Sequence, residues 1–247
     1  MQIVEISFFC DLPHRGCFTT TTNQARTRRS FDIVSVESKN FNEVMDFLRH
    51  HFFIDEPLNA CLQLVANSEP GTCLELEQVM LSHMEQNLSL MAVNRINSHV
   101  MGVCLNVIAH PGDMEQLEKS FKDSPNKKLK ILLELLTHVD KISDVYNRFN
   151  VQKVFEISIL SVGSCCRRQG IGSALLNDSL ELARRLDHPL VRVDCSSAFT
   201  ARALDKLRFQ VVHLLRYDEY KPSSDEESPL QPTDPHREMI TMCMVLK

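Results

Sequence analysis

The chain has 247 residues and a formal net charge of −5, a length that suits one domain of generous size or two small ones. Hydrophobic residues make up 43% and charged residues 24%, so a sizeable core is possible and gross disorder is excluded. No apolar run approaches the roughly 20 residues that cross a bilayer, so we expect no membrane partner. The net negative charge and the lack of a Lys/Arg block also argue against a nucleic-acid partner.

The nine cysteines indicate a reduced compartment. Their number is odd, no pair shows the C-x2-C spacing of a zinc site, and four lie in or beside apolar runs: Cys104, Cys166, Cys195 and Cys243. The ten histidines show no metal-ligand spacing, so we expect no metal. Residues 1–30 lack a signal-peptide pattern and are predicted to form a poorly ordered extension of a cytoplasmic protein.

Strand and helix patterns alternate along the first half. A strand is expected over 31–36, followed by a helix from Phe41 that is interrupted at 55–59, where Pro57 cannot donate a backbone hydrogen bond. Further on, we expect a helix over 74–83, a hairpin of strands 88–96 and 99–109, a polar stretch over 110–128 and a helix over 128–139.

The second half continues the alternation more clearly. Strands are expected over 153–162, 190–195, 210–216 and 238–246, with helices over 171–186 and 198–207 and a polar loop over 221–236. The pattern predicts an α/β (α+β) fold with a mixed sheet. We expect a single domain over residues 31–247, because no linker-like stretch divides it.

The most informative segment is the junction 163–172, GSCCRRQGIG, which follows an apolar strand and opens a long helix. Such a junction exposes unpaired backbone N–H groups at the positive end of a helix dipole, which favours an anion. Gly170 and Gly172 allow close approach of a ligand, and Arg167 and Arg168 supply donors suited to phosphate. The spacing fits neither a dinucleotide fingerprint nor a P-loop, and taken alone it also fits an ordinary glycine-bearing turn.

The arrangement Arg167-x-x-Gly170-x-Gly172 resembles the pyrophosphate loop with which GNAT N-acetyltransferases hold acetyl-CoA. The segment FFIDEPLN at 52–59 resembles the FFxDEPLN element of the insect arylalkylamine N-acetyltransferases, the dopamine N-acetyltransferase group. Other matches to that family follow in the same order: ILSV at 159–162, CSS at 195–197, TAR at 200–202, YKP at 220–222 and PH at 235–236. The resemblance covers about residues 31–247 and implies the GNAT fold, in which helices flank a mixed, mostly antiparallel central sheet.

The resemblance implies three catalytic residues. Glu56 corresponds to the family's general base, which acts through ordered water on the substrate amine. A primary amine is a cation near neutral pH and must lose a proton before it can attack. Ser196 and Thr200 fall on two serine positions linked to proton handling and to the thiol end of the cofactor. The alternatives are structural: Glu56 would stabilise a helix start beside Pro57, and the two hydroxyl residues would belong to a turn and a helix start.

The resemblance also implies a set of residues that bind acetyl-CoA. Backbone groups of one strand would bind the pantetheine arm and the glycine loop would bind the pyrophosphate. The expected residues are Leu160, Ser161, Val162, Arg167, Arg168, Gln169, Gly170, Ile171, Gly172 and Ser173. No covalent acyl-enzyme is implied, although Cys165 and Cys166 lie beside the loop.

Three positions depart from the family pattern. Gly163 stands where the family often has Asp, and Leu204 where many GNAT enzymes have a tyrosine acid. Arg208 stands where many have glycine; if that residue is left-handed, arginine costs on the order of 1 kcal/mol. These departures bear on the details of the expected mechanism more than on the expected cofactor site.

The sequence thus predicts a monomeric acetyl-CoA-dependent N-acetyltransferase that joins acetyl-CoA and a small amine in a ternary complex. Dopamine, serotonin, tyramine and octopamine are the amines that the resemblance suggests. The alternatives are a different amine such as agmatine or a polyamine, a longer acyl-CoA, or a catalytically weak protein that binds CoA.

Overall fold

The structure is a computed structural model that describes residues 29–65, 72–221 and 228–246. The expected extension over 1–30 therefore lies almost wholly outside the described residues, as does Pro222 of the C-terminal pattern. Within the described ranges, every helix is too short or too polar to cross a membrane.

A seven-stranded sheet forms the centre of the described structure, with the strand order β1-β2-β3-β4-β5-β7-β6. The strands are β1 (Phe31–Ser35), β2 (Leu90–Asn94), β3 (Val100–Ala109), β4 (Val154–Val162), β5 (Leu190–Cys195), β6 (Gln210–Arg216) and β7 (Glu238–Val245). Of the neighbouring pairs described, only β4 and β5 run parallel. The expected mixed, mostly antiparallel sheet is confirmed.

The helices are α2 (Phe41–Phe47), α3 (Phe53–Asp55), α4 (Pro57–Leu62), α5 (Leu74–Glu85), α6 (Asp113–Ser120), α7 (Lys127–Ser143), α8 (Val145–Arg148), α9 (Ile171–Arg185) and α10 (Ala198–Lys206). Two 3-10 turns, η1 (Ser38–Asn40) and η3 (Ser164–Cys166), and a π-helical turn, η2 (Leu48–Phe52), complete the set. The strand predictions agree with the structure to within about three residues at each end. Most of the helix predictions do as well.

Helix α6 falls in the polar stretch 110–128, for which the sequence predicted no helix. The helix has eight residues, of which only Met114 and Leu117 are buried. Two apolar positions three residues apart are too few to reveal a helical period in a sequence rich in charge. The start of the helix is fixed locally, because Gly112 is left-handed with φ 87° and the Asp113 carboxylate accepts a hydrogen bond from the backbone of His110.

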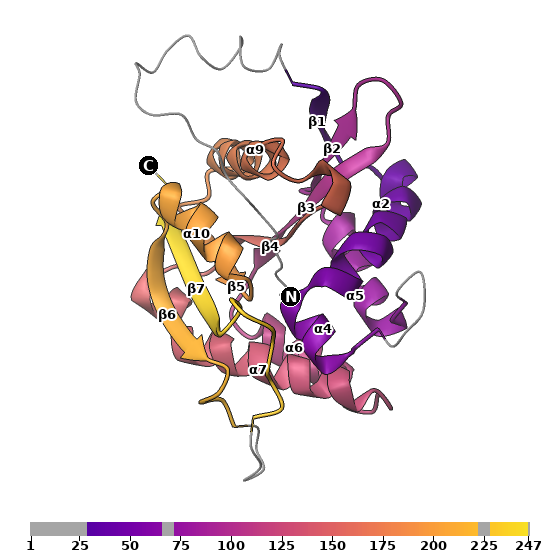
Figure 1. Cartoon of the computed structure of the whole chain (residues 1–247). Helices are drawn as coiled ribbons and strands as arrows, with labels where there is room; N and C mark the ends of the chain where they lie inside the picture. The colour runs from indigo at the N-terminus through magenta and orange to yellow at the C-terminus, as the bar shows by residue number, and fades with distance from the viewer. Residues whose placement is uncertain (1–28, 66–71, 222–227, 247) are drawn as a thin grey trace.

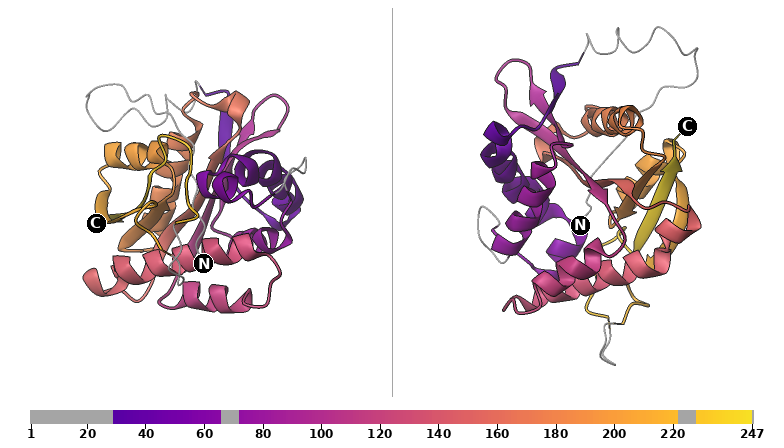
Figure 2. Two further views of the ribbon diagram at one scale, coloured as in Figure 1. Left: turned by 60° about the horizontal axis from the view of Figure 1, so that its bottom comes forward. Right: turned by 180° about the vertical axis from the view of Figure 1, so that it is seen from behind.

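Two apolar cores lie on opposite faces of the sheet. Helices α9 and α10 cover one face, and α2, α4 and α5 lie on the other side of β4 (Figure 1). Both views of Figure 2 show α7, the long pink helix, running from beneath the N-terminal helices toward the β6–β7 edge. Six apolar side chains of α7 and the side chain of Thr137 are buried: Leu129, Leu132, Leu133, Leu135, Leu136, Thr137 and Val139. Burial of each leucine stabilises the fold by about 1.5–3 kcal/mol.

A β-bulge in β4 changes the direction of the side chains along that strand. Leu105 of β3 pairs with Ile159 and the next residue pairs with Ile157, so Ser158 is the extra residue of the bulge. As a result, Ile157 packs in the core beneath α9, whereas Ile159 packs in the core on the other face. The bulge therefore redirects the last residues of β4.

Gly102 of β3 fixes how closely α9 approaches the sheet. A Cβ at this position would lie 3.0 Å from Ile171 Cγ2 and 3.0 Å from the Ser161 carbonyl oxygen. Only glycine therefore allows the first residue of α9 to rest on β3 and β4 at this distance. The close contact holds the start of α9 over the end of β4.

Candidate active site

Strands β4 and β5 separate along their length. They share only two ladder positions, Phe155–Val191 and Glu156–Arg192. Beyond these, β5 pairs with β7 to its end and β4 pairs with β3 to its end. In the described structure, residues 157–162 of β4 therefore have no strand partner on the β5 side. This divergence, termed the strand fork, leaves a backbone edge that can accept an extended ligand as an added strand.

The backbone groups expected to bind pantetheine lie on this edge. Leu160, Ser161 and Val162 form the end of β4, beyond the last rung that it shares with β5. Their side chains are buried, so only their backbone can meet a ligand. The fork thus places the three expected residues together, in an arrangement suited to the pantetheine arm.

The glycine loop ends at the N-terminus of α9, which no side chain caps. Gly170 is the N-cap residue and is left-handed with φ 75°, and a Cβ added there would meet nothing within 4 Å. The open space and the N–H groups of the first turn of α9, at the positive end of the helix dipole, suit an anion. Arg168 and Gln169 are exposed beside it, whereas Ile171 is buried beneath α9 and can offer a ligand only its backbone.

Arg167 does not extend into the solvent in this structure. Its Nη2 lies 2.7 Å from Asp55 Oδ2, and its Nε donates to the Val162 carbonyl oxygen at 3.3 Å. The ion pair joins the glycine loop to the segment FFIDEPLN, although the two motifs are far apart in the sequence. Sequence reasoning did not predict this role for Asp55; its place directly before Glu56 was the available signal.

Glu56 is both a helix cap and a buried carboxyl group. It is the N-cap residue of α4, with Pro57 in the first turn, and its Oε2 accepts a hydrogen bond from the Asn59 backbone N–H at 2.5 Å. The structural role expected as the alternative is therefore present. However, the side chain is only 1% exposed, and burial raises its pKa from 4.5 to about 7 against the opposing hydrogen bonds. A carboxyl group with this pKa can exchange a proton near neutral pH.

Three polar atoms near the start of α4 are buried without a hydrogen-bond partner among the described residues. They are Glu56 Oε1 and the two carboxamide atoms of Asn59. Leaving a buried polar group unpaired costs about 1–3 kcal/mol, so these atoms mark a position for water or for polar atoms of a ligand. Sequence reasoning did not single out Asn59.

Ser196 and Thr200 are both buried. Ser196 follows the last residue of β5, and its side chain forms a hydrogen bond that favours the ionised form of Glu56 and so lowers its pKa. Ser197 caps α10 by accepting from the Phe199 N–H, and Thr200 lies in the first turn of that helix. The structure therefore brings Ser196 to Glu56 and places Thr200 in the first turn of the helix that follows.

Tyr217 was not predicted. Its phenol is 2% exposed and donates a hydrogen bond to the Ser196 carbonyl oxygen at 3.2 Å. Burial, and then the charge of Glu56, raise the pKa of Tyr217 well above its usual value. Because it lies in the turn after β6, no local pattern connects it with the other residues. Leu204, where many GNAT enzymes have tyrosine, is a fully buried core residue.

Glu56 lies at the open end of the strand fork. Ser196, which bonds to it, directly follows β5. Asp55, which precedes it in the chain, binds Arg167, and Arg167 in turn donates to the last residue of β4. The ends of both strands are thus connected to the start of α4, which places the buried carboxyl group of Glu56 where a ligand in the fork would end.

The remaining sequence observations concern the loop and α10. Cys165 is exposed, its Sγ lies 3.5 Å from that of Cys166, and burial raises the pKa of Cys166 to about 11, which disfavours a nucleophilic thiolate. Arg208 is left-handed with φ 67° just after α10, so the expected local strain is present. Gly163 has an ordinary φ of −51°, so the backbone does not require glycine there.

Solved structures identify the family. A scan of the sequence against models of protein families finds no match. The crystal structure of arylalkylamine N-acetyltransferase 2 from Aedes aegypti is 30% identical, with a TM-score of 0.81, and the match covers 89% of this chain and 100% of that chain.

Two further structures share the fold at lower identity. Drosophila melanogaster polyamine N-acetyltransferase, which forms N-acetylagmatine, is 23% identical with a TM-score of 0.76 over 87% of this chain and 100% of that chain. A mosquito arylalkylamine N-acetyltransferase like 5b is 22% identical with a TM-score of 0.79 over 88% of this chain and 100% of that chain. The expected fold is confirmed, and the chain belongs to the insect arylalkylamine N-acetyltransferase family, as an acyltransferase with the GNAT fold.

Proposed function

We propose that the protein transfers the acetyl group of acetyl-CoA to the primary amine of a small arylalkylamine, such as dopamine, serotonin, tyramine or octopamine. The observation that carries the proposal is the buried carboxyl group of Glu56 at the open end of the strand fork, with a pKa of about 7 and an unpartnered oxygen. Bound acetyl-CoA supplies the acetyl group as a thioester. The chain supplies the position and the proton acceptor.

The residues of the cofactor site fit acetyl-CoA in shape and charge. The unpaired edge of β4 at Leu160, Ser161 and Val162 suits the extended pantetheine arm. The uncapped start of α9 suits the pyrophosphate. The loop residues that would hold the pyrophosphate are Arg167, Arg168, Gln169, Gly170, Ile171, Gly172 and Ser173.

Glu56 accepts a proton from the ammonium group of the substrate, either directly or through a water molecule on its free oxygen. Because its pKa is about 7, both protonation states are well populated at neutral pH, which suits a group that takes up and releases a proton in every turnover. Ser196, hydrogen-bonded to Glu56, and Thr200, in the first turn of α10, are the hydroxyl groups that can pass protons on toward the leaving thiol.

The family to which the chain belongs favours an arylalkylamine, which carries one positive charge. At Glu56, burial raises the pKa and three hydrogen bonds oppose the rise, so this one carboxyl group is available to the ammonium of such an amine. A second cationic group, as in agmatine or a polyamine, would need a buried carboxylate to pair with. Phe52 and Phe53, just before the DEPLN segment, are fully buried in the core beside it and give that core an aromatic character.

The test is a thiol-release assay at saturating acetyl-CoA with a panel of dopamine, serotonin, tyramine, octopamine, agmatine and spermidine. We expect the arylalkylamines to be turned over with higher kcat/KM than agmatine and spermidine. Glu56→Gln should lower kcat/KM by about 10²–10⁴-fold while CoA affinity, measured by calorimetry, is retained. If no amine releases CoA above background, the enzyme proposal fails. If Glu56→Gln keeps full activity, the role of Glu56 is wrong.

A further inference from the structure

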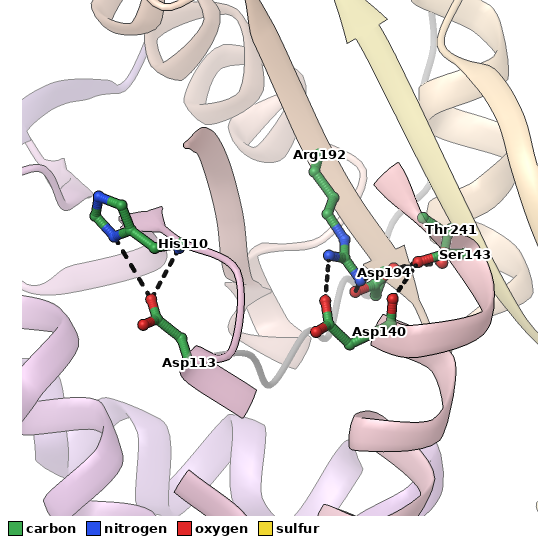
Figure 3. A network of polar contacts seen from close by, with 7 residues as sticks. All are labelled: His110, Asp113, Asp140, Ser143, Arg192, Asp194 and Thr241. Carbon is green, nitrogen blue, oxygen red and sulfur yellow. Dashed lines mark hydrogen bonds and ion pairs between the residues drawn. The ribbon is translucent and has the colours of Figure 1, made fainter. Parts of the chain in front are cut away.

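A buried ionic cluster lies outside the proposed reaction site. The guanidinium of Arg192 in β5 is fully buried, with Nη1 2.6 Å from Asp140 Oδ1 in α7 and Nη2 2.8 Å from Asp194 Oδ2 in β5 (Figure 3). Thr241 of β7 donates a hydrogen bond to Asp194 at 2.6 Å. The reaction as proposed uses none of these groups.

The cluster sits at the base of the strand fork. Arg192 is the ladder partner of Glu156 of β4, and this is one of only two positions at which β4 and β5 are joined. Glu156 is fully buried, and its charge acts on Arg192 together with those of Asp140 and Asp194. One guanidinium therefore connects β4, β5 and α7 at the point from which the two strands diverge, and Thr241 extends the connection to β7.

The cluster contains more acidic groups than basic groups. Three carboxylates face one guanidinium, and two of them, Glu156 and Asp194, belong to the two different strands of the fork. With Arg192 in place, both strands are attracted to the same cation. Without it, the carboxyl groups of β4 and β5 lose their shared partner and must take up protons or admit water, because an unpaired buried charge is costly. Loss of the cation should therefore loosen the base of the fork.

We propose that Arg192 is a positioning residue for the cofactor, because it sets the separation of β4 and β5 and so the spacing of the edge at 157–162 that receives the pantetheine arm. This inference rests on the proposed function. A buried ion pair is often no more stabilising than apolar residues of the same volume, so stability alone does not account for a charged cluster at this position. A role in setting the geometry of the fork explains why the charged cluster lies at the base of the fork.

The test compares Arg192→Met, which removes the charge and keeps a long side chain, with Asp140→Asn and with the control Leu129→Ala. Leu129 is fully buried at the other end of α7, so its truncation lowers stability without touching the cluster. Melting temperatures are measured first, and the later measurements are made where all variants are folded. They are the Kd for CoA by calorimetry, the KM values for acetyl-CoA and amine, and hydrogen exchange at 157–162.

We expect Arg192→Met to raise the Kd for CoA and the KM for acetyl-CoA by about tenfold or more, with kcat and the amine KM changed by less than about threefold. Hydrogen exchange at 157–162 should be faster than in the wild type. Asp140→Asn removes the carboxylate of α7 that holds the guanidinium of Arg192 in place and should raise the Kd by about threefold. Leu129→Ala should lower the melting temperature and leave the Kd for CoA unchanged.

The proposal is overturned if folded Arg192→Met binds CoA as the wild type does, or if Leu129→Ala weakens CoA binding to the same extent. If Arg192→Met does not fold, Asp140→Asn decides in the same way. If the wild type binds no CoA, the proposed function fails. The positioning role is then judged on hydrogen exchange alone, which must be faster at 157–162 in Arg192→Met than in Leu129→Ala.

Discussion

Replacing Glu56 by glutamine should make the protein more stable at alkaline pH while removing its activity. Burial holds the pKa of Glu56 at about 7, well above the 4.5 of an exposed glutamate. The folded state therefore binds the proton more tightly than the unfolded state. Stability from this group is fully present below about pH 4.5 and is lost as the pH rises through 7.

The size of the effect follows from the two pKa values. A rise from 4.5 to about 7, at about 1.4 kcal/mol for each pH unit, corresponds to about 3 kcal/mol of lost stability at pH 9. Glutamine carries no charge at any pH and can still accept the hydrogen bond from Asn59. Glu56→Gln should thus match the wild type at pH 4 and exceed it by about 3 kcal/mol at pH 9, or roughly 6–12 °C in melting temperature.

Differential scanning calorimetry at pH 4, 5, 7 and 9 measures this difference, and it suits a chain that contains no tryptophan. Glu85→Gln is the matched control, because Glu85 is an exposed residue of α5 and the same substitution there should leave the melting temperature unchanged. Equal melting temperatures for Glu56→Gln and the wild type at pH 9 would refute the reasoning. A gain of the same size at pH 4 would refute it as well, because the charge of Glu56 could not be the cause.

Three further predictions follow from individual residues. The kcat/KM of the wild type should rise with pH through a limb near pH 7, since Glu56 must be ionised to accept a proton, and a pH profile of Glu56→Gln should lack this limb. Gly102→Ala should lower stability by about 1–3 kcal/mol in urea unfolding, because its Cβ would overlap Ile171 and the Ser161 carbonyl; an unchanged midpoint would contradict the close contact. Arg208→Gly should raise stability by about 1 kcal/mol and the melting temperature by roughly 2–4 °C, because glycine adopts φ 67° without strain; a lower melting temperature would count against it.

Regular periodicity explains which elements the sequence predicts well. Strand β5 and strand β6 have the predicted ends because each lies between polar or turn-forming residues and is rich in β-branched or apolar side chains. Helix α6 and the short α8 were not predicted, since α8 has four residues and α6 has only two buried apolar side chains. Elements of this kind are held by the structure around them rather than by their own pattern.

The site could be predicted only where its residues belong to local motifs. Glu56 and the glycine loop stand out because neighbouring residues carry the pattern. Tyr217 and Asn59 do not, because Tyr217 reaches Ser196 only through the folded sheet, and Asn59 is notable only for its unpaired buried carboxamide. The ion pair of Asp55 with Arg167 likewise depends on the tertiary fold.

The exposed thiol of Cys165 gives the glycine loop a natural reporter group. Of the seven cysteines in the described ranges, Cys165 alone is exposed, and it lies two residues before Arg167 in the loop. Among these seven, alkylation by a small electrophile should therefore be fastest at Cys165, and a ligand seated on the start of α9 should slow it. Mass spectrometry of the labelled peptide can then follow occupancy of the loop without turnover. The same thiol adds one equivalent of background to any colorimetric measurement of released CoA.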